Sequence, residues 1–308
     1  MRNDAKEPAN DGASAPVPKR SRRIIASLAL LIVALLVIQT WTYRPITTGG
    51  AAIPFAADMA LVSHAGVGLE AATYSNSREA LDAAVARGFT RIEVDFEETR
   101  DGRIVAAHDW NQTYLELRPG FPPPPLDRLF HWRAPDHARF MAPPMRGGLT
   151  PVDAEYLAGW LARHPDVKIV TDIKTDNPRI LARLIEAGLP RHQVVPQIYS
   201  RAELAAVRRL GFDEVIYTLY RDTEAPIPEV IAFAREHGIA VTIHSARVSR
   251  EMMGAFREAG VPVYVHTINA PEQALRLREW GAAGVYTDFL APVPIYGSRD
   301  ADSIWQPR

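Results

Sequence analysis

The feature that most restricts the fold is a regular alternation of short β-branched runs with longer amphipathic stretches between residues 61 and 287. Strand-sized runs separated by helical patterns are typical of βαβ units, which build parallel sheets. The runs predicted to form strands are Leu61–Ser63, Arg91–Phe96, Val167–Ile173, Val194–Tyr199, Glu214–Leu219, Ala240–His244, Val263–Thr267 and Gly284–Thr287.

Helical periodicity separates most of these runs. The predicted helices are Ser77–Arg87, Pro151–Arg163, Pro178–Ala187, Ala202–Leu210, Pro228–His237, Arg250–Ala259 and Pro271–Trp280. Eight strands with helices between them favour an α/β fold, a closed (β/α)8 TIM barrel, which a chain of this length accommodates as one domain. An open doubly wound sheet is the alternative, although the sequence carries neither a Gly-rich dinucleotide fingerprint nor a P-loop.

The N-terminal region predicts a membrane anchor. A basic cluster at residues 19–23 precedes an apolar run at residues 24–38, and residues 39–43, with Trp41 and Tyr43, extend this run. About 20 helical residues rise roughly 30 Å, enough to cross the hydrocarbon core of a bilayer. The basic flank is expected to stay in the cytoplasm, which places the following domain on the extracytoplasmic side of the cell membrane. A cleaved signal peptide is the alternative interpretation.

These patterns divide the chain into five parts. A Pro- and aromatic-rich loop at about 111–150 interrupts the barrel, and on such a fold it is expected to lie over the C-terminal face, where active sites form. The parts are a disordered basic cytoplasmic tail (1–23), a single-pass transmembrane helix (24–43), a linker (44–58), the barrel (59–295) and a C-terminal tail (296–308).

Composition excludes several classes of function. The chain has no cysteine, which rules out disulfides, thiolate nucleophiles and cysteine-based metal sites. Its formal net charge of −1 gives no overall field that favours nucleic acid, so no nucleic-acid partner is expected.

The strongest local signal for chemistry is the pair Glu93 and Asp95. Two residues apart on a strand, both side chains point to the same face, which on a barrel strand is the interior. Two carboxylates this close repel each other, so either one is protonated or a cation lies between them. Hard oxygen ligands suit Mg²⁺ or Ca²⁺. A pair that is simply solvated, or bonded to a neighbouring basic residue, remains the alternative.

Further polar residues follow predicted strands. His64 comes directly after the first strand, and His108 follows a turn at Asp101-Gly102 that returns the chain toward the same end of the barrel. Asp172 and Lys174 share a face by strand alternation, so Asp172 can supply a third oxygen ligand and Lys174 can hold an anion. The alternative for the last two residues is a simple ion pair.

Together these segments resemble the glycerophosphodiester phosphodiesterase family, one of the phospholipase-C-like phosphodiesterase barrels. That family shows His-Arg-Gly, Pro-Glu-Asn-Thr, Glu-x-Asp, Thr-x-Asp-Gly, His-Asp, Glu-x-Lys, Trp-Thr-x-Asn and Thr-Asp in this order. The matching segments here are His64-Ala65-Gly66, Tyr74-Ser75-Asn76-Ser77, Glu93-Val94-Asp95, Thr99-Arg100-Asp101-Gly102, His108-Asp109, Asp172-Ile173-Lys174, His266-Thr267-Ile268-Asn269 and Thr287-Asp288.

Four departures from that pattern bear on the substrate. Ala65 replaces an arginine that helps to bind phosphate in the family, and Ser75 replaces a glutamate. Asp172 shortens a metal ligand by one methylene, and His266 replaces tryptophan. These changes affect the expected substrate more than the expected reaction type.

The resemblance implies metal-dependent hydrolysis of a phosphodiester, namely a glycerophosphodiester cleaved to an alcohol and glycerol 3-phosphate, with one divalent cation, Mg²⁺ or Ca²⁺. The implied roles are catalysis by His64 and His108, metal binding by Glu93, Asp95 and Asp172, and substrate or phosphate binding by Lys174, Asn76, Tyr199 and His266.

Two other functions remain open at this point. A related barrel phosphodiesterase acting on a lysophospholipid, a sphingolipid or a cell-envelope polymer fits the membrane anchor and the aromatic loop. A catalytically silent envelope-binding barrel fits the changes at Ala65 and Ser75. In every case the expected partners are a small phosphodiester or lipid and the membrane itself.

Overall fold

The computed structural model describes residues 24–25, 27–34, 46–118, 134–142 and 144–293. The chain forms two units, residues 1–44 and residues 45–308. In the first unit, residues 24–25 and 27–34 are helical. None of the described helices has the length and apolar character needed to span a membrane. Residues 26 and 35–43 of the predicted transmembrane segment lie outside the described residues.

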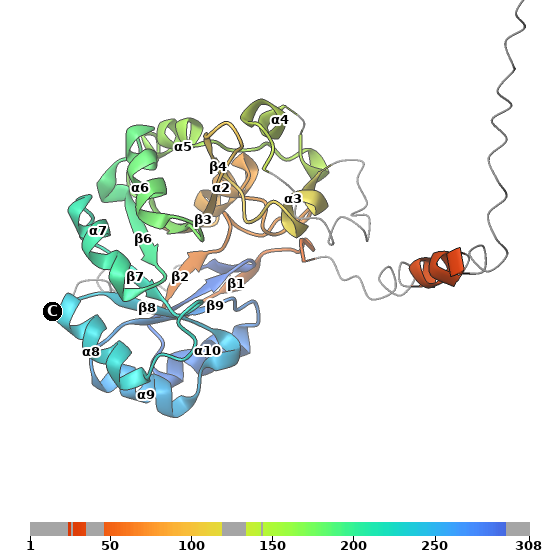
Figure 1. Ribbon diagram of the computed structural model, residues 1–308. Helices are drawn as coiled ribbons and strands as arrows, with labels where there is room; N and C mark the ends of the chain where they lie inside the picture. Colours follow the sequence, from red (N-terminus) through yellow and green to blue (C-terminus); the bar gives the residue numbers. More distant parts are fainter. Residues whose placement is uncertain (1–23, 26, 35–45, 119–133, 143, 294–308) are drawn as a thin grey trace, which may run out of the picture. The chain divides into compact units, whose positions relative to one another are not determined.

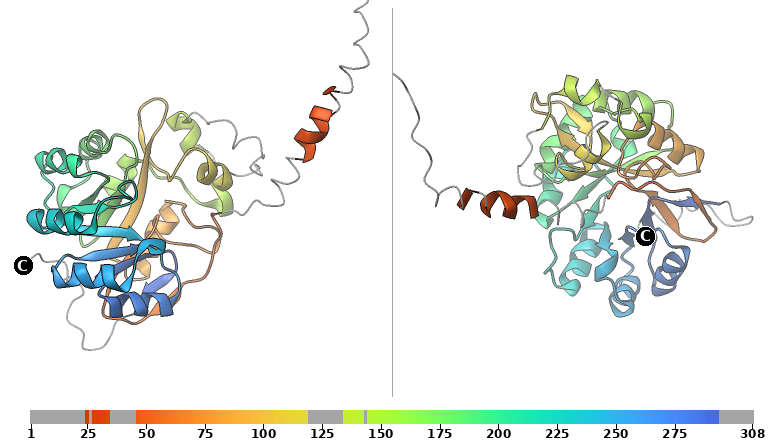
Figure 2. Two further views of the ribbon diagram at one scale, coloured as in Figure 1. Left: turned by 60° about the horizontal axis from the view of Figure 1, so that its bottom comes forward. Right: turned by 90° about the vertical axis from the view of Figure 1, so that its right-hand side faces the viewer.

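In the described part of the second unit, eight parallel strands close into a barrel, with helices around its outside (Figures 1 and 2). Neighbouring strands follow one another in sequence, and pairing of β2 with β3 and with β10 closes the ring. The barrel strands are β2 (Ala60–Ser63), β3 (Arg91–Glu98), β5 (Lys168–Asp172), β6 (Val194–Ile198), β7 (Ile216–Thr218), β8 (Ala240–His244), β9 (Val263–His266) and β10 (Gly284–Thr287).

The helices follow the expected amphipathic stretches. Several begin at a serine or aspartate whose side chain accepts a backbone N–H, such as Ser77 before α2 and Asp153 before α5. The helices are α2 (Arg78–Ala86), α3 (Gln112–Leu117), α4 (His137–Met141), α5 (Ala154–Leu161), α6 (Asn177–Glu186), α7 (Leu204–Arg209), α8 (Ile227–His237), α9 (Arg250–Glu258) and α10 (Pro271–Trp280).

The structure confirms the predicted closed barrel, and every predicted barrel strand overlaps an observed one. It also adds elements in two segments that the sequence assigned to a linker and a loop. Strand β1 (Ile53–Phe55), in the predicted linker, pairs with β11 (Leu290–Pro292) in a separate parallel sheet. The predicted long loop contains α3, α4 and the 3-10 turn η1 (Arg146–Gly148), while residues 119–133 and 143 lie outside the described residues.

The core consists of two layers. Inside the barrel, one buried cluster fills the ring with side chains from seven different strands, Val62, Val170, Val195, Ile216, Ala240, Tyr264 and Tyr286. A larger cluster lies between the strands and the surrounding helices, as in other barrels. Apolar side chains fill the interior of the barrel. The inward-facing polar side chains near the C-terminal ends of the strands are therefore gathered at the C-terminal end of the barrel.

Candidate active site

Three carboxylates meet at the C-terminal ends of β3 and β5. Asp95 and Asp172 are register partners on these neighbouring strands, and Glu93 lies two residues earlier on β3. One oxygen from each side chain lies within 4.8 Å of the others. Glu93 and Asp95 are buried, with exposed fractions of 2% and 1%. The structure therefore brings together the three residues predicted to bind a metal.

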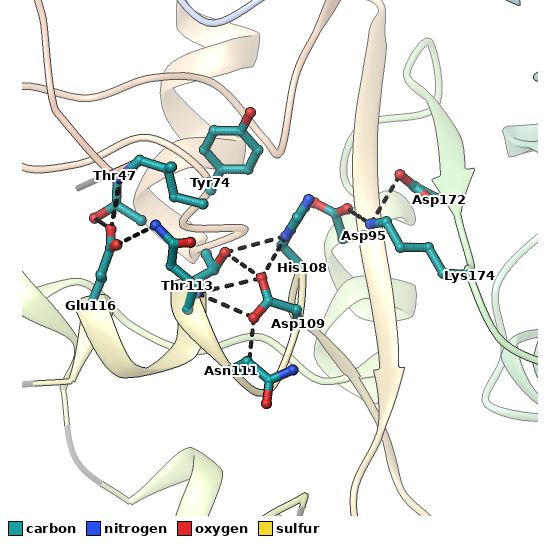
Figure 3. Close-up of polar contacts among 12 residues, drawn as sticks. Thr47, Tyr74, Asp95, His108, Asp109, Asn111, Thr113, Glu116, Asp172 and Lys174 are labelled. Carbon is teal, nitrogen blue, oxygen red and sulfur yellow. Dashed lines mark hydrogen bonds and ion pairs between the residues drawn. The ribbon is translucent and has the colours of Figure 1, made fainter. Parts of the chain in front are cut away.

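Lys174 lies against two of these carboxylates. Its Nζ atom is 2.9 Å from Asp95 Oδ1 and 3.2 Å from Asp172 Oδ2 (Figure 3). Burial disfavours the Asp95 carboxylate, but Lys174 and the two nearby histidines outweigh it and hold the pKa of Asp95 well below its usual range. Burial and the neighbouring Asp95 raise the pKa of Glu93 well above its usual range.

This donor set fits a divalent cation. Hard carboxylate oxygens are the ligands that Mg²⁺ and Ca²⁺ prefer. Burial also raises the pKa of Asp172. A second positive charge beside Lys174 would favour the ionised forms of Glu93 and Asp172, so the residues present suit such an ion electrostatically.

Asn76 fixes the position of Asp95. Its side-chain amide donates to Asp95 Oδ2 at 3.0 Å, and its amide oxygen accepts the backbone N–H of Asp95 at 3.1 Å. Asn76 has a φ of 47°, a left-handed conformation that asparagine tolerates better than most residues. These contacts orient a carboxylate of the cluster, and the predicted binding of substrate by Asn76 stays a prediction.

His64 is held by the far end of the chain. Its Nδ1 lies 2.8 Å from Asp288 Oδ1, because Ser63 on β2 is the register partner of Thr287 on β10. Asn269 donates to the other oxygen of Asp288 at 2.7 Å. Burial lowers the pKa of His64, but the Asp288 carboxylate and the more distant β3 carboxylates outweigh it and raise the pKa to about 9.

His108 has its own carboxylate partner. Its Nδ1 lies 2.8 Å from Asp109 Oδ2, which also accepts a 2.5 Å hydrogen bond from the Thr113 hydroxyl on α3 (Figure 3). Burial lowers the pKa of His108, but Asp95 and Asp109 outweigh it and raise the pKa above the usual value. Both histidines therefore bind carboxylates through Nδ1, which leaves Nε2 for a substrate.

Tyr74 lies between the two histidines. Its ring centroid is 4.8 Å from that of His64 and 5.0 Å from that of His108, with an edge-on arrangement in both pairs. Tyr74 adopts a φ of 56°, in the left-handed region where a non-glycine residue is strained. This ring separates the imidazoles, so each can face a different oxygen of one substrate.

Tyr199 and His266 have different surroundings. The Tyr199 hydroxyl donates to Asp172 Oδ1, which places Tyr199 at the carboxylate cluster, while its predicted role in substrate binding stays a prediction. His266 packs edge-on against His244, its register partner on β8, with ring centroids 5.5 Å apart. Burial lowers the pKa of His266 to about 3, and its buried Nε2 has no hydrogen-bond partner among the described residues.

Ala65 offers no side-chain group that could bind a phosphate. Ala65 is fully buried with a φ of 50°, and its backbone N–H donates to Glu93 Oε2 at 2.7 Å. The next residue, Gly66, has a φ of 85°, and a Cβ there would lie 2.7 Å from the Cβ of Ala80. The tight turn thus supports Glu93 through its backbone rather than supplying a guanidinium.

Three residues near the site were not predicted as site residues. Arg221 follows β7, and its guanidinium lies 5.2 Å from the ring centroid of Tyr199. Thr113 contacts His108 and Asp109, and it lies in the segment that the sequence analysis assigned to a loop. Glu97 continues the inward face of β3, and burial raises the pKa of Glu97 to about 7.

Sequence comparison finds a distant relative whose own name gives no function. No protein-family model matches the chain. An uncharacterised protein of Bacillus subtilis, YqiK, is 25% identical over 220 residues, which cover 70% of this chain and 89% of that protein.

Solved structures with the same architecture carry phosphodiesterase names. A glycerophosphodiester phosphodiesterase from Agrobacterium tumefaciens has a TM-score of 0.54 at 16% identity, covering 75% of this chain and 96% of that one. One from Parabacteroides distasonis has a TM-score of 0.55 at 15% identity, covering 78% and 94%. A phosphodiesterase from Oleispira antarctica, in complex with its product sn-glycerol-3-phosphate, has a TM-score of 0.52 at 14% identity, covering 75% and 93%. This chain therefore has the closed barrel fold of the glycerophosphodiester phosphodiesterase structures.

Proposed function

We propose that this protein is a phosphoric diester hydrolase that cleaves a glycerophosphodiester to an alcohol and glycerol 3-phosphate. One observation carries the proposal. Two histidines, each bound through Nδ1 to a carboxylate, flank Tyr74 beside a cluster of three carboxylates and Lys174. The likeness to structures named as glycerophosphodiester phosphodiesterases agrees with it.

The histidines supply the proton transfers. In the net reaction one P–O ester bond breaks, the oxygen of water joins phosphorus, and a proton reaches the leaving alcohol. The ion pair with Asp288 keeps His64 protonated near neutral pH, which suits a proton donor to the leaving oxygen, and His108 then accepts the proton of the nucleophile. Each transfer of this kind contributes about 10²–10⁴-fold to the rate.

The phosphate is stabilised by positive charge. Among the described residues, the Lys174 ammonium beside Asp95 and the exposed Arg221 guanidinium beside Tyr199 are two cations proposed to face phosphoryl oxygens, in place of the arginine that is missing at Ala65. Glu93, Asp95 and Asp172 would hold one Mg²⁺ or Ca²⁺. When bound, such an ion polarises the phosphoryl group and neutralises charge that develops in the transition state.

Ala65 also favours a second candidate, a catalytically silent barrel that binds an envelope phosphodiester. The buried Ala65 removes one phosphate-binding group while leaving the carboxylates and Lys174 in place. A protein of this kind would bind a diester without turning it over.

Turnover separates these two candidates. The full-length protein in detergent is incubated with glycerophosphocholine, glycerophosphoethanolamine and bis(4-nitrophenyl) phosphate, with Mg²⁺, Ca²⁺ or EDTA. Hydrolysis that EDTA abolishes and that His108→Ala lowers about 10²–10⁴-fold supports the enzyme. His192→Ala, a change at an exposed histidine of the 3-10 turn η2 (Arg191–Gln193), is the matched control. Binding of a diester without metal-dependent turnover would favour the silent barrel.

Membrane anchoring remains a proposal and rests on exposed apolar side chains. Leu30 and Leu31 in the N-terminal helical segment are 71% and 58% exposed, as expected for residues that face lipid. The barrel is proposed to lie on the extracytoplasmic side, since the basic cluster precedes this segment. Protease digestion of intact spheroplasts tests the topology, because an extracytoplasmic barrel is degraded and a cytoplasmic barrel is protected.

A further inference from the structure

The first described residues of the barrel unit, Ile46 and Thr47, form a strap that contacts two supports of the proposed active site. On one side, the backbone N–H groups of Ile46 and Thr47 donate to Glu116 Oε2 at 3.1 and 3.0 Å. The Thr47 hydroxyl donates to the same oxygen at 2.8 Å (Figure 3). On the other side, the carbonyl of Ile46 accepts the Thr73 hydroxyl at 3.1 Å. Two adjacent residues therefore join two segments that lie far apart along the chain.

Glu116 on α3 is the acceptor that holds the strap. Its side chain is fully buried, with an exposed fraction of 0%. Its second oxygen, Oε1, accepts from the side-chain amide of Gln112 at 2.9 Å. A carboxylate is costly to bury unless its oxygens accept hydrogen bonds, so the burial of Glu116 depends on these donors. Loss of the strap would therefore remove three donors from a buried oxygen.

Helix α3 connects Glu116 to His108. Thr113 lies three residues before Glu116, on the same face of this helix. The Thr113 hydroxyl donates to Asp109 Oδ2 at 2.5 Å and lies 3.2 Å from His108 Nδ1 (Figure 3). Because Asp109 Oδ2 is also 2.8 Å from that nitrogen, a displacement of α3 would disturb both groups that fix the imidazole ring.

The short length of α3 makes its position depend on the rest of the protein. The helix contains six residues, Gln112–Leu117, and its N-cap residue Asn111 makes no side-chain capping hydrogen bond. Isolated helices shorter than about 12–15 residues are marginal in water, so tertiary contacts decide where such a helix lies. Leu117 packs with Ala72 and Leu149, and the strap supplies a polar contact at the same end of the helix. The position of α3 therefore depends on both contacts.

The other arm of the strap supports Tyr74. Thr73, whose hydroxyl binds the Ile46 carbonyl, directly precedes Tyr74 and is only 4% exposed. Tyr74 has a φ of 56°, and a strained backbone of this kind persists only where surrounding contacts hold it. The strap therefore supports the ring that packs between His64 and His108 as well as the helix that contacts His108.

From these contacts we propose that Ile46, Thr47 and Glu116 are positioning residues, which hold His108 and Tyr74 in the geometry needed for catalysis. They act through α3 and Thr73 and are not assigned any contact with the substrate. The kinetic part of this inference rests on the proposed function, because the strap supports a proton transfer by His108. A displacement of a reacting group by about 1 Å can cost on the order of 100-fold in rate.

The first test replaces Glu116 by two residues of similar size in the full-length protein in detergent. Glu116→Met removes both acceptor oxygens, whereas Glu116→Gln keeps one for the strap. With glycerophosphocholine, Glu116→Met is expected to lower kcat about 10–100-fold with KM within about twofold of the wild type. Glu116→Gln is expected to recover most of kcat. Glu258→Met, at an exposed position on α9, is the matched control, and all kinetics are measured below each melting temperature.

A milder variant tests the strap from its other end. Thr47→Val removes one hydroxyl donor and leaves both backbone donors in place. It is expected to lower kcat about three- to tenfold, the effect of one hydrogen bond. Thr48→Val, at the exposed neighbouring residue, is the matched control and is expected to keep the wild-type kcat. Wild-type kcat in both Thr47→Val and Glu116→Met would overturn the proposal.

The Nδ1 proton of His108 gives a readout that does not need turnover. A proton shared with a carboxylate has a downfield NMR signal, which is assigned here by its loss in His108→Gln. This signal is expected to shift or broaden in Glu116→Met and to keep its wild-type position in Glu116→Gln and Glu258→Met. If the wild type cleaves glycerophosphocholine but Glu116→Met changes neither kcat nor this signal, the strap proposal fails and the proposed function stands. If the signal changes in Glu116→Met while the wild type cleaves no diester, the proposed function fails and the strap still positions His108.

Discussion

The ion pair between His64 and Asp288 makes protein stability depend on pH in a way that one substitution removes. The contact joins residues 224 positions apart, and the exposed fractions of the two side chains are 12% and 8%. The rise in the pKa of His64 from 6.5 to about 9 is equivalent to about 3 kcal/mol, at roughly 1.4 kcal/mol for each pH unit.

The direction in which stability changes with pH follows from the linkage between protonation and folding. Because the pKa of His64 is higher in the folded state than in the unfolded state, the stabilisation is complete below the unfolded value of 6.5 and is lost as pH rises through about 9. In Asp288→Asn the carboxylate is gone while burial remains, so the pKa of His64 is expected to fall and this part of the pH dependence to vanish.

The assay is urea unfolding of the metal-free protein in EDTA at about pH 6 and about pH 10. Between these conditions the wild type is expected to lose about 3 kcal/mol more unfolding free energy than Asp288→Asn, as an order of magnitude. Other titrating groups, among them Glu93, contribute to both proteins and largely cancel in this difference. Equal pH dependence in the two proteins would refute the reasoning, and NMR titration of the His64 ring would show whether the pKa or the linkage is at fault.

Three other perturbations follow from the site and the core. Asn76→Ala removes both hydrogen bonds to Asp95 and puts alanine in a left-handed conformation, so calorimetric titration should show Mg²⁺ affinity about 10–100-fold lower; unchanged affinity would contradict the orienting role. Arg221→Ala should raise KM for a phosphodiester more than it lowers kcat, while an equal fall in kcat and kcat/KM would mean that Arg221 acts only in the transition state. Phe256→Ala, at a buried position on α9, should cost about 3–5 kcal/mol by chemical denaturation, and a loss below 1 kcal/mol would show that the core there closes around the cavity.

Much of the barrel could be predicted because its signals are local. A β-branched run, a capped amphipathic stretch and the next run each follow from nearby residues, and right-handed parallel connections leave few ways to assemble eight such units. The Glu93–Asp95 pair was equally readable, since strand alternation alone places both carboxylates on one face. Strand β1 was missed because its three residues carry no alternation, and it forms only by pairing with β11.

What each site residue contacts was decided by closure of the barrel. The sequence by itself determined the strands, the inward carboxylates and the two histidines, because periodicity and motif spacing are properties of neighbouring residues. Only the tertiary structure brought Asp288 to His64, through the register of Ser63 with Thr287, and turned Asn76 toward Asp95. It alone brought Trp110 and Tyr114 into ring contact with Phe140 on α4, since these residues lie far apart along the chain and meet only when α3 and α4 pack together.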